Sequence, residues 1–181
     1  TVTKEQVFLD YKNFHIQITD LPGAYSLNDY TIEEKVTKDF LDSNEYDIIL
    51  NVLDSTNLQR NLLLTAQLLT LDKKMIIALN MIDEAQKESI IIDEVQLSKI
   101  LGKPCIKTSA AKKIGVTKLL DEIIFKFQSE KVPNKRYFSN VIEEEIENIS
   151  NVLKENKYET DLTYRHIALN LLKEDKTIYK I

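Results

Sequence analysis

The chain has 181 residues, of which 43% are hydrophobic and 29% are charged, so it can bury a core and is not a disordered tail. A formal net charge of −5 argues against a protein that holds nucleic acid through the phosphate backbone. A single cysteine, Cys105, excludes an internal disulfide framework, and no apolar run reaches the ~20 residues that a transmembrane helix needs.

Two strand patterns and a capped helix come first along the chain. Residues 6–20 carry two runs of alternating apolar side chains around residues 11–13, which predicts an antiparallel hairpin. Thr31 and Glu34 have the spacing of a capping box, which predicts a helix that starts there and ends near Ser43.

Strand and helix patterns then alternate. The strand patterns lie at 46–54, 73–80 and 104–109, and the helix patterns lie at 57–72, 93–101 and 116–130. The first two strand runs are apolar enough to be buried on both faces. This order predicts an α/β fold with a parallel sheet and helices on both of its faces.

The last part of the chain shows only helical patterns. Residues 131–136 are the one credible linker, so we expect an α/β domain over 1–131 and the start of a small all-helical domain over 132–181. Within the latter, we expect His166 at the surface and the carboxylates of 143–147 on a solvated helix face. The chain starts without methionine and stops inside a helical pattern, which favours a piece of a longer protein.

The first candidate site is Asp20-Leu21-Pro22-Gly23, directly after a strand run. In open α/β sheets, ligands bind at the carboxyl ends of the strands. A carboxylate there can hold Mg²⁺, and a following glycine lets a backbone N–H approach a phosphate. An ordinary Pro-Gly turn explains the tetrapeptide equally well.

The second candidate is Asn80-Met81-Ile82-Asp83, after the strand run 73–80. An Asp carboxylate can accept hydrogen bonds from N1–H and the exocyclic amine of guanine, whereas adenine leaves the same carboxylate unpaired. The N-x-x-D pattern is weak alone, because residues 44–47 and 51–54 also match it. Only the 80–83 motif lies wholly at a strand exit.

The third candidate is Thr108-Ser109-Ala110-Ala111, after the last strand run. Its small residues would let a backbone N–H reach O6 of a base, while Ser109 braces the loop that carries Asp83. A plain helix cap before the helix expected at 116–130 explains the same residues.

Taken together, the order D-x-x-G, N-x-x-D, S-A at three successive strand exits resembles the guanine-nucleotide loops of Ras-like P-loop GTPases. The strings TDLPGAYSL, NVLDSTNLQRNLLLTAQLL and ALNMID resemble the G domain of the bacterial ferrous iron transport protein B (FeoB) family. The strings YFSNVIEEEIENI and TYRHIALNLLKEDK resemble the helical spacer domain that follows it.

The resemblance implies roles for matching residues. Thr1 and Asp20 would bind Mg²⁺, Gly23 would approach the γ-phosphate, and Met81 would pack its thioether on the base. The implied nucleotide-binding residues are Asp20, Leu21, Pro22, Gly23, Asn80, Met81, Ile82, Asp83, Ser109, Ala110 and Ala111.

Two departures from the family pattern matter. Ala24 stands where Ras-like proteins carry a water-positioning glutamine, so we identify no catalytic residue and expect slow GTP hydrolysis. No G-x-x-x-x-G-K-[ST] motif occurs, so the phosphate-binding loop is missing. The family places that loop after a first, central strand, which we expect to precede Thr1. Alone, the chain is expected to bind nucleotide poorly.

The resemblance thus implies a switch domain that binds GTP and GDP and regulates Fe²⁺ passage through a membrane permease domain of the same polypeptide. It would lie on the cytoplasmic side of the bacterial inner membrane. One alternative is an RNA-associated assembly GTPase, which the balance of eight basic and nine acidic residues over 132–181 disfavours. The other is a structural module whose nucleotide site has decayed. The sequence leaves open both self-association and assistance by a monovalent cation.

Overall fold

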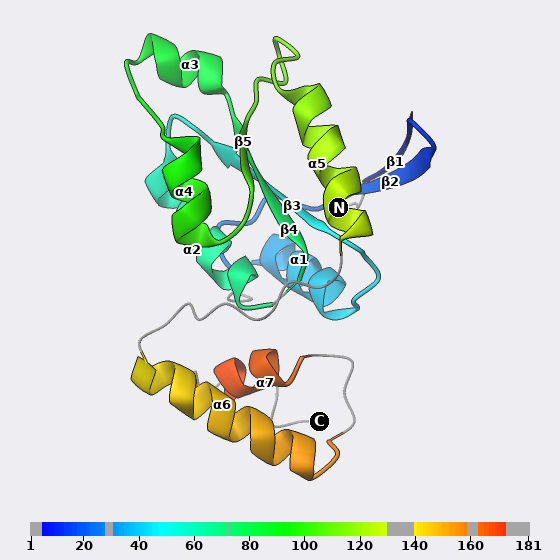
Figure 1. Cartoon of the computed structure of the whole chain (residues 1–181), viewed down its shortest axis with the longest axis vertical. Helices are drawn as coiled ribbons and strands as arrows, with labels where there is room; N and C mark the ends of the chain where they lie inside the picture. The colour runs from blue at the N-terminus through cyan, green and yellow to red at the C-terminus, as the bar shows by residue number, and fades with distance from the viewer. Residues whose placement is uncertain (1–4, 28–30, 72, 130–139, 159–162, 173–181) are drawn as a thin grey trace.

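The structure, a computed structural model, describes residues 5–27, 31–71, 73–129, 140–158 and 163–172 (Figure 1). An α/β part comes first, and two helices follow it. The elements are β1 (Glu5–Tyr11), β2 (Phe14–Asp20), α1 (Ile32–Asp42), β3 (Ile49–Asp54), α2 (Leu58–Leu69), β4 (Met75–Asn80), α3 (Ile82–Lys87), α4 (Glu94–Leu101), β5 (Cys105–Lys107), α5 (Val116–Gln128), α6 (Asn140–Glu155) and α7 (Tyr164–Leu172). None of the described helices is both long enough and apolar enough to cross a membrane.

The two strands β1 and β2 form the predicted antiparallel hairpin, with Tyr11 paired to Phe14 at its closed end. The hairpin is held against α5 by polar and aromatic contacts. The Tyr11 hydroxyl and the Lys12 ammonium donate to Asp121 Oδ1 at 2.8 and 2.7 Å. The Phe14 ring meets Phe127 edge-on, with ring centroids 6.2 Å apart.

The capped helix is also confirmed. The Thr31 side chain accepts the backbone N–H of Glu34 at 3.1 Å, and α1 ends with Ser43 as its C-cap. This bond satisfies one of the helix's four unpaired N–H groups, which is why the local sequence alone could place the helix start.

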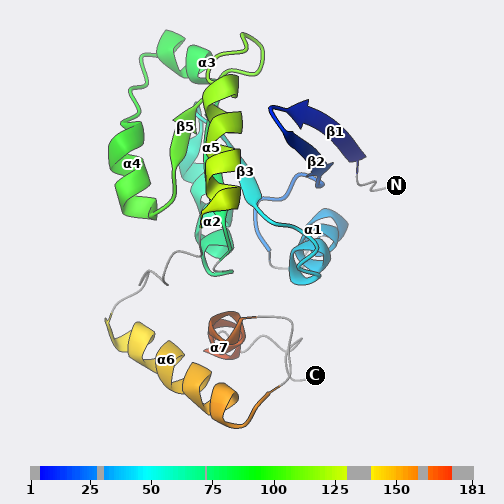
Figure 2. The same cartoon turned by 45° about the vertical axis from the view of Figure 1, so that its right-hand side comes forward.

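The strands β3, β4 and β5 form a parallel sheet, with β4 in the middle. The central strand is almost inaccessible, and the exposed fraction of Met75 through Leu79 is 2% or less. Figures 1 and 2 show α4 on one side of β5 and α5 on the other. The predicted α/β fold is therefore confirmed.

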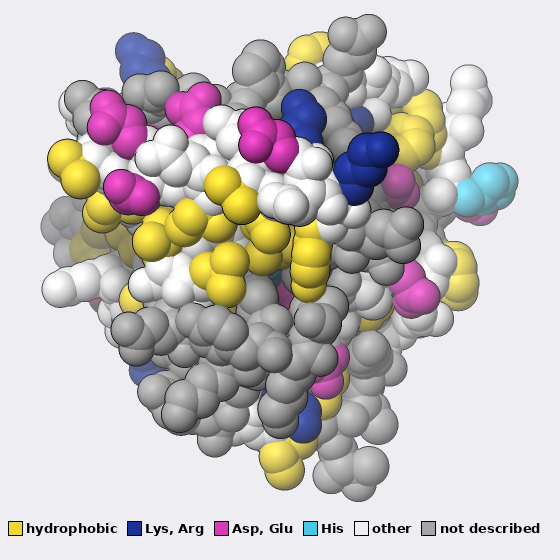
Figure 3. Space-filling model, turned by 90° about the horizontal axis from the view of Figure 1, so that it is seen from below, with side chains coloured by type: hydrophobic (Ala, Val, Ile, Leu, Met, Phe, Trp, Pro, Cys, Tyr) yellow, Lys and Arg dark blue, Asp and Glu magenta, His cyan; other side chains and the backbone are white. Residues whose placement is uncertain are grey.

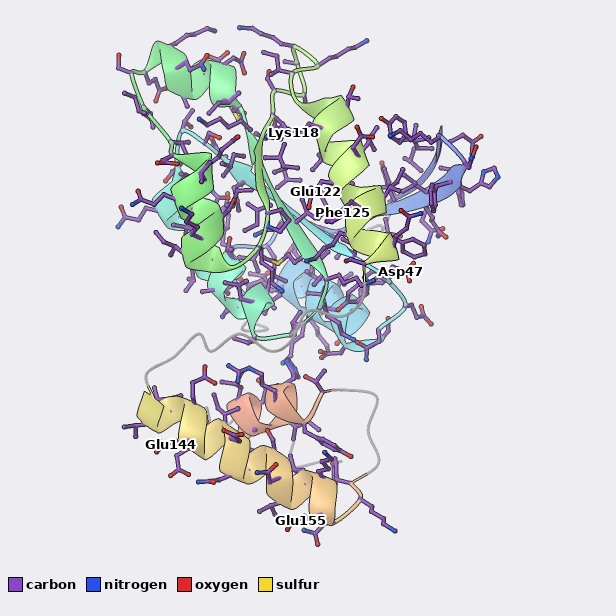
Figure 4. All side chains as sticks on the ribbon, viewed as in Figure 1. Asp47, Lys118, Glu122, Phe125, Glu144 and Glu155 are labelled. Atoms are coloured by element: carbon purple, nitrogen blue, oxygen red, sulfur yellow. The ribbon has the colours of Figure 1, made fainter. Side chains whose placement is uncertain are left out.

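The hairpin and the parallel sheet are separate sheets, because β2 and β3 share no strand pairing. Strand β3 consequently buries one face only, and its side chains Leu50 and Val52 are 36% and 55% exposed. The expectation that this strand is buried on both faces is wrong for that face, because no described residue covers it fully. Helix α5 likewise has no buried residue, although its side chains form an apolar stripe. Figure 4 shows Lys118, Glu122 and Phe125 following one another along α5.

The opposite edge of the sheet, β5, is closed by side chains of α4. The Ser98 hydroxyl accepts the N–H of Cys105 at 2.9 Å, and Glu94 Oε2 accepts the N–H of Lys107 at 3.3 Å. Both are backbone donors that an edge strand otherwise presents to solvent.

The two C-terminal helices pack on each other around Ile146, Ala168 and Leu169, which are buried. Arg165 on α7 donates two hydrogen bonds to Glu143 on α6, at 2.7 and 2.9 Å. Figure 3 views this end of the molecule and shows hydrophobic side chains gathered beside a row of acidic ones.

Two expectations for these helices are wrong. Glu143 is 3% exposed because it faces Arg165, whereas Glu144, labelled in Figure 4, lies in solvent as expected. His166 is 8% exposed because it packs at the start of α7, where its Nε2 lies 3.8 Å from Asp42 Oδ1 of α1.

Candidate functional site

The loop after β2 begins with Asp20, the last residue of the strand, whose side chain is exposed. The chain beyond it is tied down on α1 and α2. The Pro22 carbonyl accepts the hydroxyl of Thr37 at 3.1 Å, the Ser26 hydroxyl donates to Glu34 at 2.7 Å, and the Leu27 N–H donates to Gln67 at 2.8 Å. These three bonds bracket Gly23, so the loop is anchored on both sides of the glycine.

The conformation of the loop at position 23 does not itself require a glycine. A Cβ built there meets no atom within 4 Å, and its backbone is not in the left-handed region. Glycine costs conformational entropy on folding, so packing does not explain its presence here. Leu21 and Ala24 on either side are partly buried, and Ala24 carries no group that could position a water.

The loop after β4 turns sharply at Met81, which has the left-handed φ of 60° and precedes α3. After this turn, Ile82 and Asp83 are buried, with exposed fractions of 5% and 7%, whereas Met81 is 40% exposed. The Ile82 N–H donates to the Thr108 carbonyl at 3.1 Å, and Asn80 Oδ1 accepts the N–H of Ala110 at 3.0 Å. The β4 and β5 loops are therefore fastened to each other at one end of the sheet, where Figure 1 shows α3 beside the loop that leads into α5.

The Asp83 carboxylate has donors from the β5 loop. A hydrogen bond from the Ser109 side chain, together with the hydrogen bond and the charge of Lys112, holds the pKa of Asp83 below its ordinary value, although burial opposes this. The Lys112 ammonium lies 3.2 Å from Asp83 Oδ2. Asp83 is therefore an anion at neutral pH, and it can accept hydrogen bonds only.

The loop that carries these donors is closed on itself. Ser109, which is fully buried, exchanges both backbone hydrogen bonds with Ile114, each at 3.0 Å. Gly115 follows with φ of 72°, and a Cβ there would lie 2.1 Å from the Lys107 carbonyl oxygen. Only glycine fits at this position, so backbone geometry fixes where Ser109 and Lys112 lie.

The structure brings Asn80, Asp83, Ser109 and Ala110 together, and leaves the 20–23 loop on the separate hairpin. Ala111 lies next to them and is exposed. Thr1 lies outside the described residues. Sequence reasoning missed Lys112. The available signal was its position three residues after Ser109, because a loop that turns back at Gly115 directs the Lys112 side chain toward Asp83.

The donor set restricts which metal could bind. Within the described part of the chain, no group of three or more His, Cys, Asp or Glu side chains could hold a metal ion. The single exposed carboxylate of Asp20 fits Mg²⁺, which binds through one or two carboxylates and keeps phosphate and water ligands.

Comparison with known proteins adds independent findings. A family model described as "Ferrous iron transport protein B" matches residues 1–123. The Fe(2+) transporter FeoB of Helicobacter pylori is 59% identical over 127 residues, which cover 68% of this chain and 20% of that protein. The corresponding protein of Campylobacter jejuni is 46% identical over 143 residues, 79% of this chain and 23% of that protein. The chain thus spans 20 to 23% of the length of these relatives.

Solved structures show the same similarity. The cytosolic domain of T. maritima FeoB in a GDP form has a TM-score of 0.89 and 33% identity, covering 99% of this chain and 70% of that one. The mGMPPNP-bound NFeoB from S. thermophilus has a TM-score of 0.83 and 35% identity, covering 99% and 67%. At these identities the likeness extends beyond the fold to the sequence.

Proposed function

Because this chain belongs to the ferrous iron transport protein B family and corresponds to its cytosolic G domain, we propose that it is a guanine-nucleotide switch that hydrolyses GTP slowly. The observation that carries the proposal is the Asp83 carboxylate, buried just after β4 and held by Ser109 from the loop after β5. The switch would regulate Fe²⁺ passage through a membrane permease domain of the same polypeptide, at the cytoplasmic side of the inner membrane.

Guanine recognition follows from the chemistry of Asp83. Its two oxygens accept from N1–H and the exocyclic amine of guanine, whereas adenine offers no donor at those positions. A base without donors would leave a mostly buried anion unpaired, which is strongly unfavourable. Asn80 supports the site by holding the Ala110 loop through its Oδ1, and its amide nitrogen is then the group that donates to the base. Relatives solved in GDP and GMPPNP forms support guanine-nucleotide binding by this domain.

The 20–23 loop is proposed as the phosphate-sensing switch. Glycine at position 23 is explained if its N–H contacts the γ-phosphate, since packing does not require it. Asp20, with Thr1, would hold Mg²⁺, which when bound neutralises charge on the β- and γ-phosphates. The anchoring of residues 22, 26 and 27 on α1 and α2 would carry movement of this loop to those helices.

Among the described residues, no further strand pairs with β2 or with the outer edge of β3, which leaves room for a missing strand. Strand β2 ends at the proposed phosphate-sensing loop, and β3 exposes the side chains of Leu50 and Val52. We infer that a phosphate-binding strand and its loop, supplied by residues outside this sequence, pair between them. With this arrangement, 1–131 is the G domain and 132–181 begins the helical spacer.

Slow hydrolysis rests on Ala24. A methyl group cannot orient an attacking water, so hydrolysis would depend on backbone and ion stabilisation. Whether a monovalent cation assists depends on the phosphate loop.

The test is a fluorescence titration of GDP against ADP on the full-length polypeptide, with Asp83→Asn and the matched control Glu84→Gln. Glu84 is the adjacent carboxylate, and it pairs with Lys87 at 2.8 Å, away from the base site. We expect GDP binding without ADP binding, a loss of GDP affinity of about tenfold or more in Asp83→Asn, and no change in Glu84→Gln. Equal binding of both nucleotides, or none in a folded protein, would contradict the proposal and favour a structural module.

A further inference from the structure

The proposed base site already contains a cation. The Lys112 ammonium lies 3.2 Å from Asp83 Oδ2, within ion-pair distance. The lysine side chain is 52% exposed, whereas that of Asp83 is 7% exposed, so the mostly buried carboxylate is paired with a cation that lies largely in solvent. A flat base could not reach both carboxylate oxygens while the ammonium stays there.

The backbone of the loop fixes the lysine but leaves its side chain free to turn away. The Lys112 N–H donates to the Ser109 hydroxyl at 3.2 Å, and the loop is closed between Ser109 and Ile114. Movement of the side chain into solvent would break one ion pair and no backbone bond. Lysine has four rotatable side-chain bonds and a strongly hydrated ammonium, which makes such a movement easy.

We propose that Lys112 is an internal competitor of guanine: its ammonium pairs with Asp83 while the base site is empty and leaves Asp83 Oδ2 when guanine binds. The inference rests on the proposed guanine site. In the empty site the lysine supplies the partner that a mostly buried carboxylate requires. In the filled site the donors of guanine take over that role.

Two consequences distinguish this role of Lys112 from that of a residue that binds the nucleotide directly. Because the empty state is stabilised by the pair, Lys112 weakens guanine-nucleotide affinity instead of strengthening it. Because the lysine leaves the site whichever base enters, its removal changes the affinity but not the preference for guanine over adenine. A ligand without a base does not displace Lys112, so its affinity is unaffected.

The experiment compares wild type, Lys112→Met and Lys113→Met in the full-length polypeptide. Methionine keeps a flexible, unbranched side chain of similar length and removes the charge. Lys113 is the adjacent lysine of the same loop and has no ion pair with Asp83 among the described residues, so it controls for loop charge. The probes are GDP, ADP and inorganic pyrophosphate, and melting temperatures are measured with and without GDP.

We expect Lys112→Met to bind GDP about two- to fivefold more tightly than wild type, which is the range for a partly exposed ion pair. Its nucleotide-free form melts at a lower temperature, its GDP-saturated form melts with wild type, and pyrophosphate affinity stays the same. Weaker GDP binding in Lys112→Met, or affinity equal to that of Lys113→Met, overturns the inference. If wild type binds GDP, only the role of Lys112 has failed; if no variant binds GDP, the guanine site has failed as well.

Discussion

Replacing Gly115 with alanine tests whether the closed loop positions the base site. The added Cβ would lie 2.1 Å from the carbonyl oxygen of Lys107 and 3.2 Å from its carbonyl carbon. Lys107 belongs to β5, whose register with β4 includes the pair Leu79 and Lys107, so the carbonyl cannot retreat without disturbing the sheet.

The magnitude has two parts. Alanine in the left-handed conformation that Gly115 adopts costs about 1–2 kcal/mol. Relieving an overpacked contact costs about 1–3 kcal/mol more. The sum, about 2–5 kcal/mol, exceeds the glycine-to-alanine gain in unfolded-state entropy of about 0.4–1 kcal/mol.

Hydrogen exchange of peptides covering 105–115 measures this loss locally, because Ser109 and Ile114 exchange backbone hydrogen bonds there. Each 1.4 kcal/mol raises exchange about tenfold, and the smallest net loss is about 1 kcal/mol, so we expect at least about a fivefold increase in Gly115→Ala. The control Gly23→Ala adds a Cβ into open space and should leave these peptides unchanged. Wild-type exchange in Gly115→Ala would refute the argument, since the loop would then relax without cost.

Two further predictions concern ion pairs away from the base site. Glu143→Gln leaves the mostly buried Arg165 without its carboxylate, so we expect the free energy of separating α6 from α7 to fall by about 3–5 kcal/mol, as measured by hydrogen exchange. Adding Arg165→Met to the same chain should restore part of this loss. Losses that simply add would contradict the pairing. Asp121→Asn removes the negative charge of the group that accepts from Lys12 and Tyr11, so these contacts weaken and exchange of the hairpin should rise. The hydrogen bonds from Lys12 and Tyr11 lower the pKa of Asp121 from 3.8, so this anchoring is fully present above that pH and is lost as the pH falls through the lowered value. Hairpin exchange that is unchanged both by the substitution and by acid would refute this prediction.

The features that the sequence predicted well are those determined by neighbouring residues. The hairpin follows from alternation around residues 11–13, and the start of α1 follows from the Thr31 side chain. The parallel sheet was predictable because its central strand is apolar throughout, as burial on both faces demands.

The features that it missed depend on partners distant in the chain. Glu143 and His166 look like surface residues in a helical pattern, yet Arg165 and the packing of α7 bury them. Lys112 is one of several lysines near the start of α5, and only the closure of its loop directs it to Asp83. The exposed face of β3 depends on which strand lies beside it, which no local pattern records.

Side chains of α4 cap the edge of β5, so a further strand would add to the parallel sheet at its β3 edge. Because Ser98 and Glu94 already accept the outward N–H groups of Cys105 and Lys107, an approaching strand finds no free backbone donors there. The β3 edge, by contrast, has no strand paired to it in the described residues and carries exposed apolar side chains. If no other strand pairs with β3, the parallel sheet would therefore add a strand from a second molecule at β3 and not at β5, and an added peptide that pairs with β3 would suppress this association.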